Sequence, residues 1–241
     1  SRSTATLEWQ GGQVDLIAAV AATGTPTVVV VISGKPLALP PAALGADALV
    51  WAFSPGMRGG RAVAEVLLGL VEPSGRLPVS VPFHVGQQPV YYNQVRGQHG
   101  TRYADLTQDP AFAFGEGLGY SAVAYADLTV HTPVVAPGAS VRATVTVTNT
   151  GGRPVREVVQ AYVSDLVTSV TWADRELKAF RSIELAPGES RRVELLVAAA
   201  ECSIVDEHAV RRVEPGMFEL LVGPSSRRRE LLAARFEIAA G

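Results

Sequence analysis

Two kinds of predicted strand divide this chain of 241 residues. In the first half, Thr27–Ser33 is a continuous, mostly β-branched run, which is typical of a strand buried on both faces of a parallel sheet. In the second half, Val141–Thr148 alternates apolar with polar residues, which buries one face of a strand and leaves the other in water. The sequence therefore predicts a mostly parallel sheet followed by an antiparallel one.

Helical patterns alternate with the buried strands of the first half. Apolar residues recur at helical spacing over Gln13–Ala22. A second helical stripe consists of Val63, Val66, Leu67 and Leu70. Another buried strand is predicted at Ala48–Phe53, and a third extended segment at Arg76–Pro82. We expect residues 1–122 to form a partial α/β-sandwich, a mostly parallel sheet with flanking helices, because about three strands are fewer than the five or six of an average sheet.

Residues 123–241 are predicted to form a second, all-β domain. The alternation recurs at Val193–Val197, and turns that contain Gly and Pro separate the expected strands. About seven short strands in roughly 115 residues, with no helical period, are typical of a fibronectin type III-like or immunoglobulin-like β-sandwich. Between the two halves, Phe83–Tyr120 shows neither period. A loop of this length is usually functional or packed against a neighbouring domain.

Charge and hydropathy argue against several classes of partner. The net charge is −2 and the pI is near 6.1, which gives no electrostatic reason to expect nucleic acid or an anionic membrane. The longest apolar run, Thr27–Ser33, is far shorter than the ~20 residues of a membrane-spanning helix. The charge run Arg227–Arg229 predicts a solvated hairpin tip. The chain begins at Ser1 with no visible signal peptide, so the sequence leaves the compartment unassigned.

The cysteine and the histidines predict neither a metal nor a cofactor. Cys202 is the only cysteine, which excludes an intrachain disulfide and a multi-cysteine zinc site, and we expect it to be a buried structural thiol. No metal-binding spacing such as H-E-x-x-H connects the histidines, which are His84, His99, His131 and His208. The serine motif G-x-S-x-G is also absent.

The loop Gly56–Arg61 lies between a predicted strand and a predicted helix, which is the layout of a phosphate-binding site. Its glycines could present N–H groups to an anion, and its two arginines could supply positive charge. However, G-x-x-x-x-G-K-[ST] and G-x-G-x-x-G are both absent, so a tight strand-to-helix connection is the favoured interpretation. A phosphate-ligand protein is the least favoured hypothesis.

Side chains in the long loop are candidates for carbohydrate chemistry. Glycoside hydrolysis needs two carboxylates, and Asp105 and Glu116 are the loop acids available, although loop acids are usually solvated. Aromatic side chains could stack on a sugar face or anchor the loop on a neighbouring domain. The tyrosines concerned are Tyr91, Tyr92 and Tyr103. The residues alone therefore leave catalysis, binding and packing open.

An ordered series of short motifs runs along nearly the whole chain. In the first half these are Thr25–Leu37, Gly56–Gly60 (G-M-R-G-G), Pro73–Pro78 (P-S-G-R-L-P), Thr101–Tyr103 (T-R-Y) and Phe114–Leu118 (F-G-E-G-L). In the second half they are Val147–Gly151 (V-T-N-T-G), Glu176–Phe180 (E-L-K-A-F) and Leu185–Ser190. Together the motifs resemble the C-terminal portion of family 3 glycoside hydrolases, in particular the bacterial β-glucosidase type.

The resemblance implies a fold and an activity. Members of the family have a (β/α)8-like barrel, an α/β-sandwich domain and often a fibronectin type III-like domain, and they hydrolyse β-linked glucosides or related glycosides at the non-reducing end with retention. A barrel aspartate is the nucleophile and a glutamate of the α/β-sandwich is the acid/base, about 5 Å apart. The resemblance implies that both lie upstream of Ser1. We therefore expect no catalytic residue in this chain and no activity from it alone.

The resemblance also leaves three candidates for substrate binding, Arg58, Tyr103 and Glu116. Arg58 stands where relatives commonly carry glutamate in G-x-E-G-G, and Glu116 where they often carry an aromatic residue or histidine. The Gly56–Gly60 loop is then interpreted as a packing loop that borders the cleft. The implied partners are a β-linked glucoside or oligosaccharide, bound through the full-length enzyme, and the N-terminal barrel of the same polypeptide. No metal, cofactor, nucleic acid or membrane is implied.

A standalone carbohydrate-binding or adhesion module is the alternative hypothesis. It would use Trp51 and the three loop tyrosines as stacking residues. If half of a parallel sheet is missing, exposed strand edges and apolar surface should also favour self-association of the chain.

Overall fold

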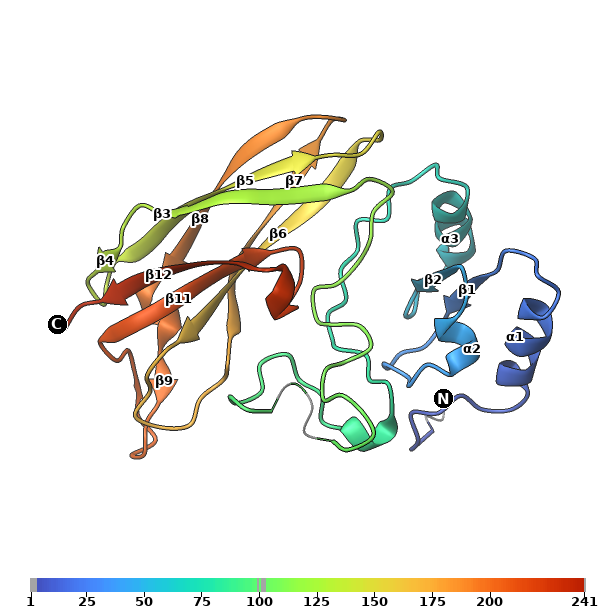
Figure 1. Cartoon of the computed structure of the whole chain (residues 1–241), viewed down its shortest axis with the longest axis horizontal. Helices are drawn as coiled ribbons and strands as arrows, with labels where there is room; N and C mark the ends of the chain where they lie inside the picture. The colour runs from blue at the N-terminus through green and yellow to red at the C-terminus, as the bar shows by residue number, and fades with distance from the viewer. Residues whose placement is uncertain (1–3, 99, 101–102, 241) are drawn as a thin grey trace.

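The computed structural model describes residues 4–98, 100 and 103–240. An α/β unit and a β-sandwich lie on opposite sides of a long connecting segment, residues 68–122 (Figure 1). The predicted class, an α/β part followed by an all-β sandwich, is therefore confirmed. Within the described ranges, no helix has the length and the hydrophobicity that crossing a membrane requires.

The α/β unit contains three helices and two strands among the described residues. They are α1 (Gln13–Ala21), β1 (Val28–Val31), α2 (Pro41–Leu44), β2 (Ala48–Trp51) and α3 (Gly59–Leu67). Strands β1 and β2 are parallel, with Val28 opposite Ala48 and Val31 opposite Trp51. The parallel pairing and the flanking helices agree with the prediction, and the sheet is small.

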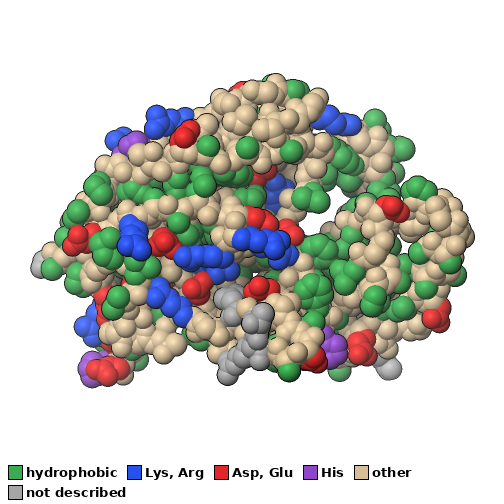
Figure 2. Space-filling model, in the orientation of Figure 1, with side chains coloured by type: hydrophobic (Ala, Val, Ile, Leu, Met, Phe, Trp, Pro, Cys, Tyr) green, Lys and Arg blue, Asp and Glu red, His purple; other side chains and the backbone are tan. Residues whose placement is uncertain are grey.

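A small apolar cluster holds the α/β unit together. Its buried members are Val29, Val31, Leu39, Ala43 and Val81. Helix α1 has no buried residue, and its Leu16 is 65% exposed. In the predicted second helical stripe, Leu67 is 46% exposed and Leu70 is 73% exposed. Figure 2 shows hydrophobic side chains spread over the visible face of this unit. Apolar side chains that the sequence pattern predicts to be buried are thus exposed in this unit.

The prediction of a third strand at Arg76–Pro82 is wrong. Apart from one bridge at Val81, the segment forms no strand, and among the described residues the sheet contains only β1 and β2. The two prolines of the segment lack the N–H groups that an interior strand must donate. Leu77 instead pairs with another part of the connecting segment, because it donates to Glu116 O at 2.9 Å and accepts from Gly115 N–H at 2.7 Å.

Ten strands are described in the second half of the chain. One sheet has the order β4-β12-β11-β6-β7, the other has the order β3-β5-β8, and β9 pairs with β10 in a separate hairpin. Their bounds are β3 (Val123–Val130), β4 (Val134–Val135), β5 (Ser140–Asn149), β6 (Val155–Asp165), β7 (Glu176–Leu185), β8 (Ser190–Ala198), β9 (Ile204–Val205), β10 (Arg211–Arg212), β11 (Gly216–Gly223) and β12 (Leu232–Ile238). The sequence predicts about seven strands because the shortest elements are too short to show a period.

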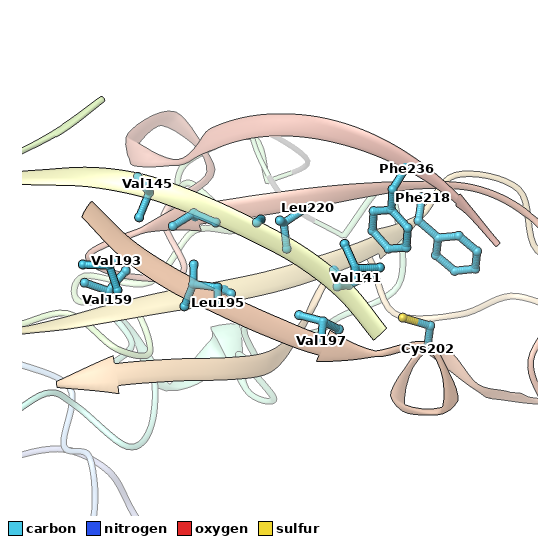
Figure 3. Packing of buried hydrophobic residues seen from close by; sticks show 14 of the residues in the cluster. Val141, Val145, Val159, Val193, Leu195, Val197, Cys202, Phe218, Leu220 and Phe236 are labelled. Carbon is cyan, nitrogen blue, oxygen red and sulfur yellow. The ribbon is translucent and has the colours of Figure 1, made fainter. Parts of the chain in front are cut away.

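The core of the sandwich lies between its two sheets (Figure 3). The predicted alternation is confirmed, since the apolar positions of β5 are buried. These positions are Val141, Ala143, Val145 and Val147. The rings of Phe218 on β11 and Phe236 on β12 stack at 5.4 Å between centroids. Burying a side chain of this size contributes about 1.5–3 kcal/mol, so this core is the main stabilising part of the chain.

The connecting segment has little regular structure. Among its described residues the one helix is the short η1 (Val85–Gln87). The buried side chain of Gln87 accepts and donates hydrogen bonds within the segment. These bonds take the place of the backbone hydrogen bonds that a sheet would provide. The ring of Tyr92 meets that of Tyr162 on β6 edge-on, with centroids 5.9 Å apart. The long loop is thus packed against the neighbouring domain, which is one of the two roles expected for it.

Candidate functional site

Glu116, a substrate-binding candidate from the sequence, lies where the connecting segment meets the sandwich. Its Oε2 accepts from Ala113 N–H at 2.6 Å and from Arg227 Nε at 2.8 Å. Arg227 also donates to Ala111 O at 2.7 Å. The side chains of Arg227 and Glu116 are 18% and 25% exposed. This pair fastens the F-G-E-G-L turn to the sandwich.

The prediction that Arg227–Arg229 forms a solvated tip is wrong for Arg227. Ser226 N–H donates to Phe114 O at 3.0 Å, which draws the start of the run against the connecting segment. The run then enters the short helix η3 (Arg228–Glu230), where the Arg229 side chain is 79% exposed. The partner of Arg227 lies 111 positions away in the sequence, so no local pattern reports it.

We expect Glu116→Gln to lower the free energy of unfolding by about 1–2 kcal/mol, because an amide cannot form the charged hydrogen bond with Arg227. Urea denaturation of the two proteins measures the difference. Asp105→Asn is the matched control, since Asp105 is exposed. An equal loss in both variants would mean that removal of one negative charge, and not the pair with Arg227, is responsible.

Arg58, the second candidate, lies at the start of α3. After β2 the chain turns through Phe53 and Gly56, whose φ angles are 50° and 73°, before α3 begins at Gly59. A positive φ is unusual for a side chain as large as Phe. A Cβ on Gly59 would meet the side chain of Pro55 at 2.5 Å. Gly56 and Gly59 allow a tight connection from β2 to α3. The side chain of Arg58, at the end of this connection, is exposed.

Tyr103, the third candidate, is 42% exposed, and its Oη donates to Gly86 O at 3.4 Å. Of the other candidate stacking rings, Tyr91 is 64% exposed, whereas Tyr92 and Trp51 lie against protein rings. Tyr92 stacks on Phe114 with centroids 4.2 Å apart, and Trp51 is tilted against a neighbouring phenyl ring at 6.0 Å. Within the described residues, no hydrogen bond, ion pair or ring contact joins two of the three substrate-binding candidates. The structure does not gather them into one site.

A hollow of about 700 Å³ lies between the connecting segment and the sandwich, and the sequence analysis missed it. Its lining includes Arg96, Asp174, Arg175, Arg227, Arg228 and Arg229. Figure 2 shows Lys and Arg side chains interspersed with Asp and Glu on this face. Several of these charges are paired, since Arg175 contacts Asp174 and Arg228 contacts Glu219. These pairs neutralise part of the positive charge that lines the hollow. Its walls come from segments far apart in the sequence, which no local motif reveals.

A buried ion pair joins the connecting segment to β6. Arg76 Nη2 donates to Glu157 Oε2 at 2.8 Å, and Tyr125 Oη donates to Glu157 Oε1 at 2.8 Å. The side chains of Arg76 and Glu157 are 9% and 4% exposed. Burial raises the pKa of the Glu157 carboxyl, whereas the Arg76 guanidinium and the hydrogen bonds oppose the rise. Both carboxylate oxygens are engaged, so Glu157 has a structural role.

The carboxyl group of Asp165, at the end of β6, also has a raised pKa. Burial raises this pKa to about 6, against the hydrogen bond from Val167 N–H. Asp165 lines a second hollow, of about 450 Å³, together with Arg96 and Trp172. Its Oδ2 has no hydrogen-bond partner among the described residues. In the same ranges, no three His, Cys, Asp or Glu side chains gather so that they could hold a metal ion.

Cys202 is a buried thiol at the end of the sandwich core, as predicted (Figure 3). Burial raises its pKa to about 11. Because the thiolate is the species that attacks disulfide reagents, we expect Cys202 to react with Ellman's reagent about a hundredfold more slowly in the native chain than in urea. The rate of thionitrobenzoate release in the two conditions measures this. Similar rates would show that the thiol is accessible in the folded chain.

Comparison with known proteins identifies the family. The glycosyl hydrolase family 3 C-terminal domain matches residues 1–120. A fibronectin type III-like domain matches residues 157–226. The chain belongs to glycosyl hydrolase family 3. The two domain types and their order along this family 3 chain are those that its sequence motifs imply.

The curated relatives of this family 3 chain are glycosidases. A periplasmic β-glucosidase of Salmonella typhimurium is 37% identical over 226 residues, which cover 90% of this chain and 30% of that protein. A β-xylosidase of Formosa agariphila is 37% identical over 234 residues, which cover 94% of this chain and 32% of that protein. The chain thus spans about a third of the length of these relatives.

Solved structures extend the likeness to the fold. A β-glucosidase involved in saponin metabolism from intestinal bacteria is 52% identical, with a TM-score of 0.93 over 98% of this chain and 34% of that one. A β-glucosidase from Listeria innocua in complex with glucose is 30% identical, with a TM-score of 0.91 over 99% of this chain and 34% of that one. The family 3 chain corresponds to the C-terminal portion of such enzymes.

Proposed function

We propose that this chain is the C-terminal part of a retaining β-glycosidase of the β-glucosidase type, which removes terminal sugars from the non-reducing ends of β-linked glycosides. The observation that carries the proposal is the 52% identity and the TM-score of 0.93 to a β-glucosidase over 98% of the chain. Since the chain covers 34% of that structure, the remaining polypeptide would supply the barrel. Its substrate would be a β-linked glucoside or oligosaccharide.

In this proposal the nucleophilic aspartate and the acid/base glutamate lie outside the chain, and none of its residues is catalytic. Two of its carboxylates are already engaged, because Glu116 is paired with Arg227 and Glu157 is paired with Arg76. Arg58 and Tyr103 stay candidates for substrate contact, because both are exposed. The function of the chain would be to complete the α/β-sandwich and to support it with the β-sandwich.

The uncovered apolar surface of the α/β unit supports a partner within the same polypeptide. Leu16 and Leu70 are 65% and 73% exposed, and the sheet of two strands leaves one edge of β1 and one of β2 unpaired within the described residues. In a complete enzyme, further strands and helices and the barrel would cover this surface. The isolated chain should therefore self-associate or bind hydrophobic dyes.

We also propose the domain boundary between residues 122 and 123. Strand β3 begins at Val123, and the match to the family 3 C-terminal domain ends at residue 120. Residues 1–122 would then be the C-terminal half of the α/β-sandwich domain with its long loop, and residues 123–241 the fibronectin type III-like domain.

A chimeric enzyme tests the proposal. The chain replaces the corresponding C-terminal third of the saponin-metabolism β-glucosidase, and turnover of p-nitrophenyl β-glucoside and β-xyloside is measured. We expect the folded chimera to hydrolyse the glucoside with retention and the isolated chain to be inactive. A chimera whose barrel nucleophile is replaced by alanine is the control. Robust turnover by the isolated chain, or a folded chimera without activity, would contradict the proposal.

A further inference from the structure

Helix α3 ends in a closed turn on the side of the sandwich. Gly69 follows the helix with a φ of 69°, and its N–H donates to Val66 O at 2.8 Å. Leu70 N–H donates to Glu65 O at 2.8 Å. These two bonds form the Schellman pattern, which satisfies carbonyl groups at a helix C-terminus. The turn gives α3 a defined end to which other residues bind.

Two further side chains bind this turn. Arg153, between β5 and β6, donates from Nη2 to Gly69 O at 2.5 Å. Its guanidinium lies over the ring of Tyr120, 5.1 Å from the centroid. Tyr120 Oη donates to Val66 O, and its backbone N–H donates to Glu72 Oε1 at 3.1 Å. Two carbonyl groups at the C-terminal turn of α3 are therefore held by residues outside the helix.

The charge of Arg153 matches this position. The C-terminus of a helix carries the negative end of the macrodipole, which a cation stabilises. The approach is close, since a Cβ on Gly69 would lie 3.3 Å from Arg153 Nη1. Stacking on Tyr120 adds a cation–π contact that orients the guanidinium.

Few other contacts hold α3. Gly59 is its only buried residue, and among the described residues the apolar cluster of the α/β unit includes none from α3. The helix has nine residues, so it is about 13 Å long, and a tilt at its C-terminal turn displaces its other end. That other end carries the Gly56–Arg58 turn, which follows the carboxyl end of β2. Ligands of open α/β sheets bind outside the carboxyl ends of strands.

We propose that Arg153 and Tyr120 are positioning residues, which hold α3 by its C-terminal turn and thereby fix the Gly56–Arg58 turn at the edge of the substrate cleft. The consequence for catalysis rests on the proposed function, whereas the hold on α3 does not. The β-sandwich, through Arg153, and the connecting segment, through Tyr120, then orient a loop of the α/β unit.

Hydrogen exchange in the chain itself tests the hold on α3 without any activity. We expect Arg153→Met to speed amide exchange over residues 59–70 about tenfold, because the helix end opens more often. Arg153→Lys should retain part of the protection, since lysine keeps the charge but not the planar fork. Arg156→Met is the matched control, because Arg156 is an exposed arginine of β6 that donates to Ser182 Oγ at 3.0 Å. Unchanged exchange in Arg153→Met overturns the proposal.

Kinetics in the chimera test the consequence for the cleft. We expect Arg153→Met to raise KM about tenfold, Tyr120→Phe to raise it less, and Arg156→Met to leave it unchanged. An unchanged KM in Arg153→Met, with activity lost only in proportion to unfolded enzyme, would mean a purely structural role and would contradict the positioning. A chimera with no activity contradicts the proposed function instead, and the exchange experiment still decides whether Arg153 holds α3.

Discussion

Arg76→Met is expected to lower the free energy of unfolding of the chain by about 3–5 kcal/mol, because it leaves a buried charge without its partner. The Glu157 side chain is only 4% exposed, so water cannot replace the guanidinium. Tyr125 still donates to the other carboxylate oxygen at 2.8 Å, but one neutral donor does not compensate a full charge. Urea denaturation, followed by circular dichroism in the β-sheet region, measures the loss.

A second substitution separates the ion pair from simple packing. Arg76→Met combined with Glu157→Leu should regain most of the lost stability, since replacing both members of a buried ion pair by apolar residues is often neutral. Arg61→Met is the matched control, because its pair with Glu65 at 2.6 Å is exposed and should matter by less than about 1 kcal/mol. A double variant as unstable as Arg76→Met would attribute the effect to packing of the arginine stem.

The loss should also grow with pH. Burial raises the pKa of Glu157, so the folded chain keeps this proton to a higher pH than the unfolded chain does. The stability contributed by such a group is greatest below its unfolded pKa and is lost as the pH rises through the folded pKa. Arg76 opposes this rise in the pKa of Glu157. When the pH is raised from about 5 to about 8, the Arg76→Met variant should therefore lose more stability than the unchanged chain. A pH-independent loss in Arg76→Met would contradict this account.

Most of the fold could be predicted because burial leaves a local pattern. Val141–Val147 alternates in the sequence and faces the core in the structure, and the run Thr27–Ser33 contains the parallel strand β1. The mistaken strand at Arg76–Pro82 has the composition of an extended segment, but its prolines remove donors that a sheet needs. An extended backbone could be predicted for Arg76–Pro82, but its pairing with a sheet could not.

The surroundings of the candidate site residues could not be predicted because their partners are distant in the sequence. Glu116 and Arg227 are 111 positions apart, and Arg76 and Glu157 are 81 positions apart. The family resemblance picks out the motifs F-G-E-G-L and P-S-G-R-L-P, but a motif does not state which side chain its charged residue binds. The only sequence signal was a charged residue within each otherwise apolar or Gly- and Pro-containing turn.

Gly115→Ala is expected to lower the free energy of unfolding by about 3 kcal/mol, the sum of left-handed backbone strain and lost buried hydrogen bonds. Gly115 has a φ of 78°, and a Cβ there would lie 2.1 Å from Gln160 Oε1. Gln160 is 3% exposed and cannot move without loss. It donates to Gly115 O at 3.0 Å and to Pro224 O at 2.5 Å, and it accepts from Tyr162 Oη at 2.6 Å.

Gly152→Ala provides the matched comparison for Gly115→Ala. Gly152 has no positive φ, and a Cβ there would meet nothing within 4 Å, so its replacement should change stability by less than about 0.5 kcal/mol. Urea denaturation of both variants measures the contrast. Amide exchange at residues 110–118 should rise only in Gly115→Ala, because displaced Gln160 no longer holds the F-G-E-G-L turn on β6. If both variants behave alike, the turn is held by the pair of Glu116 with Arg227, and the glutamine contributes little.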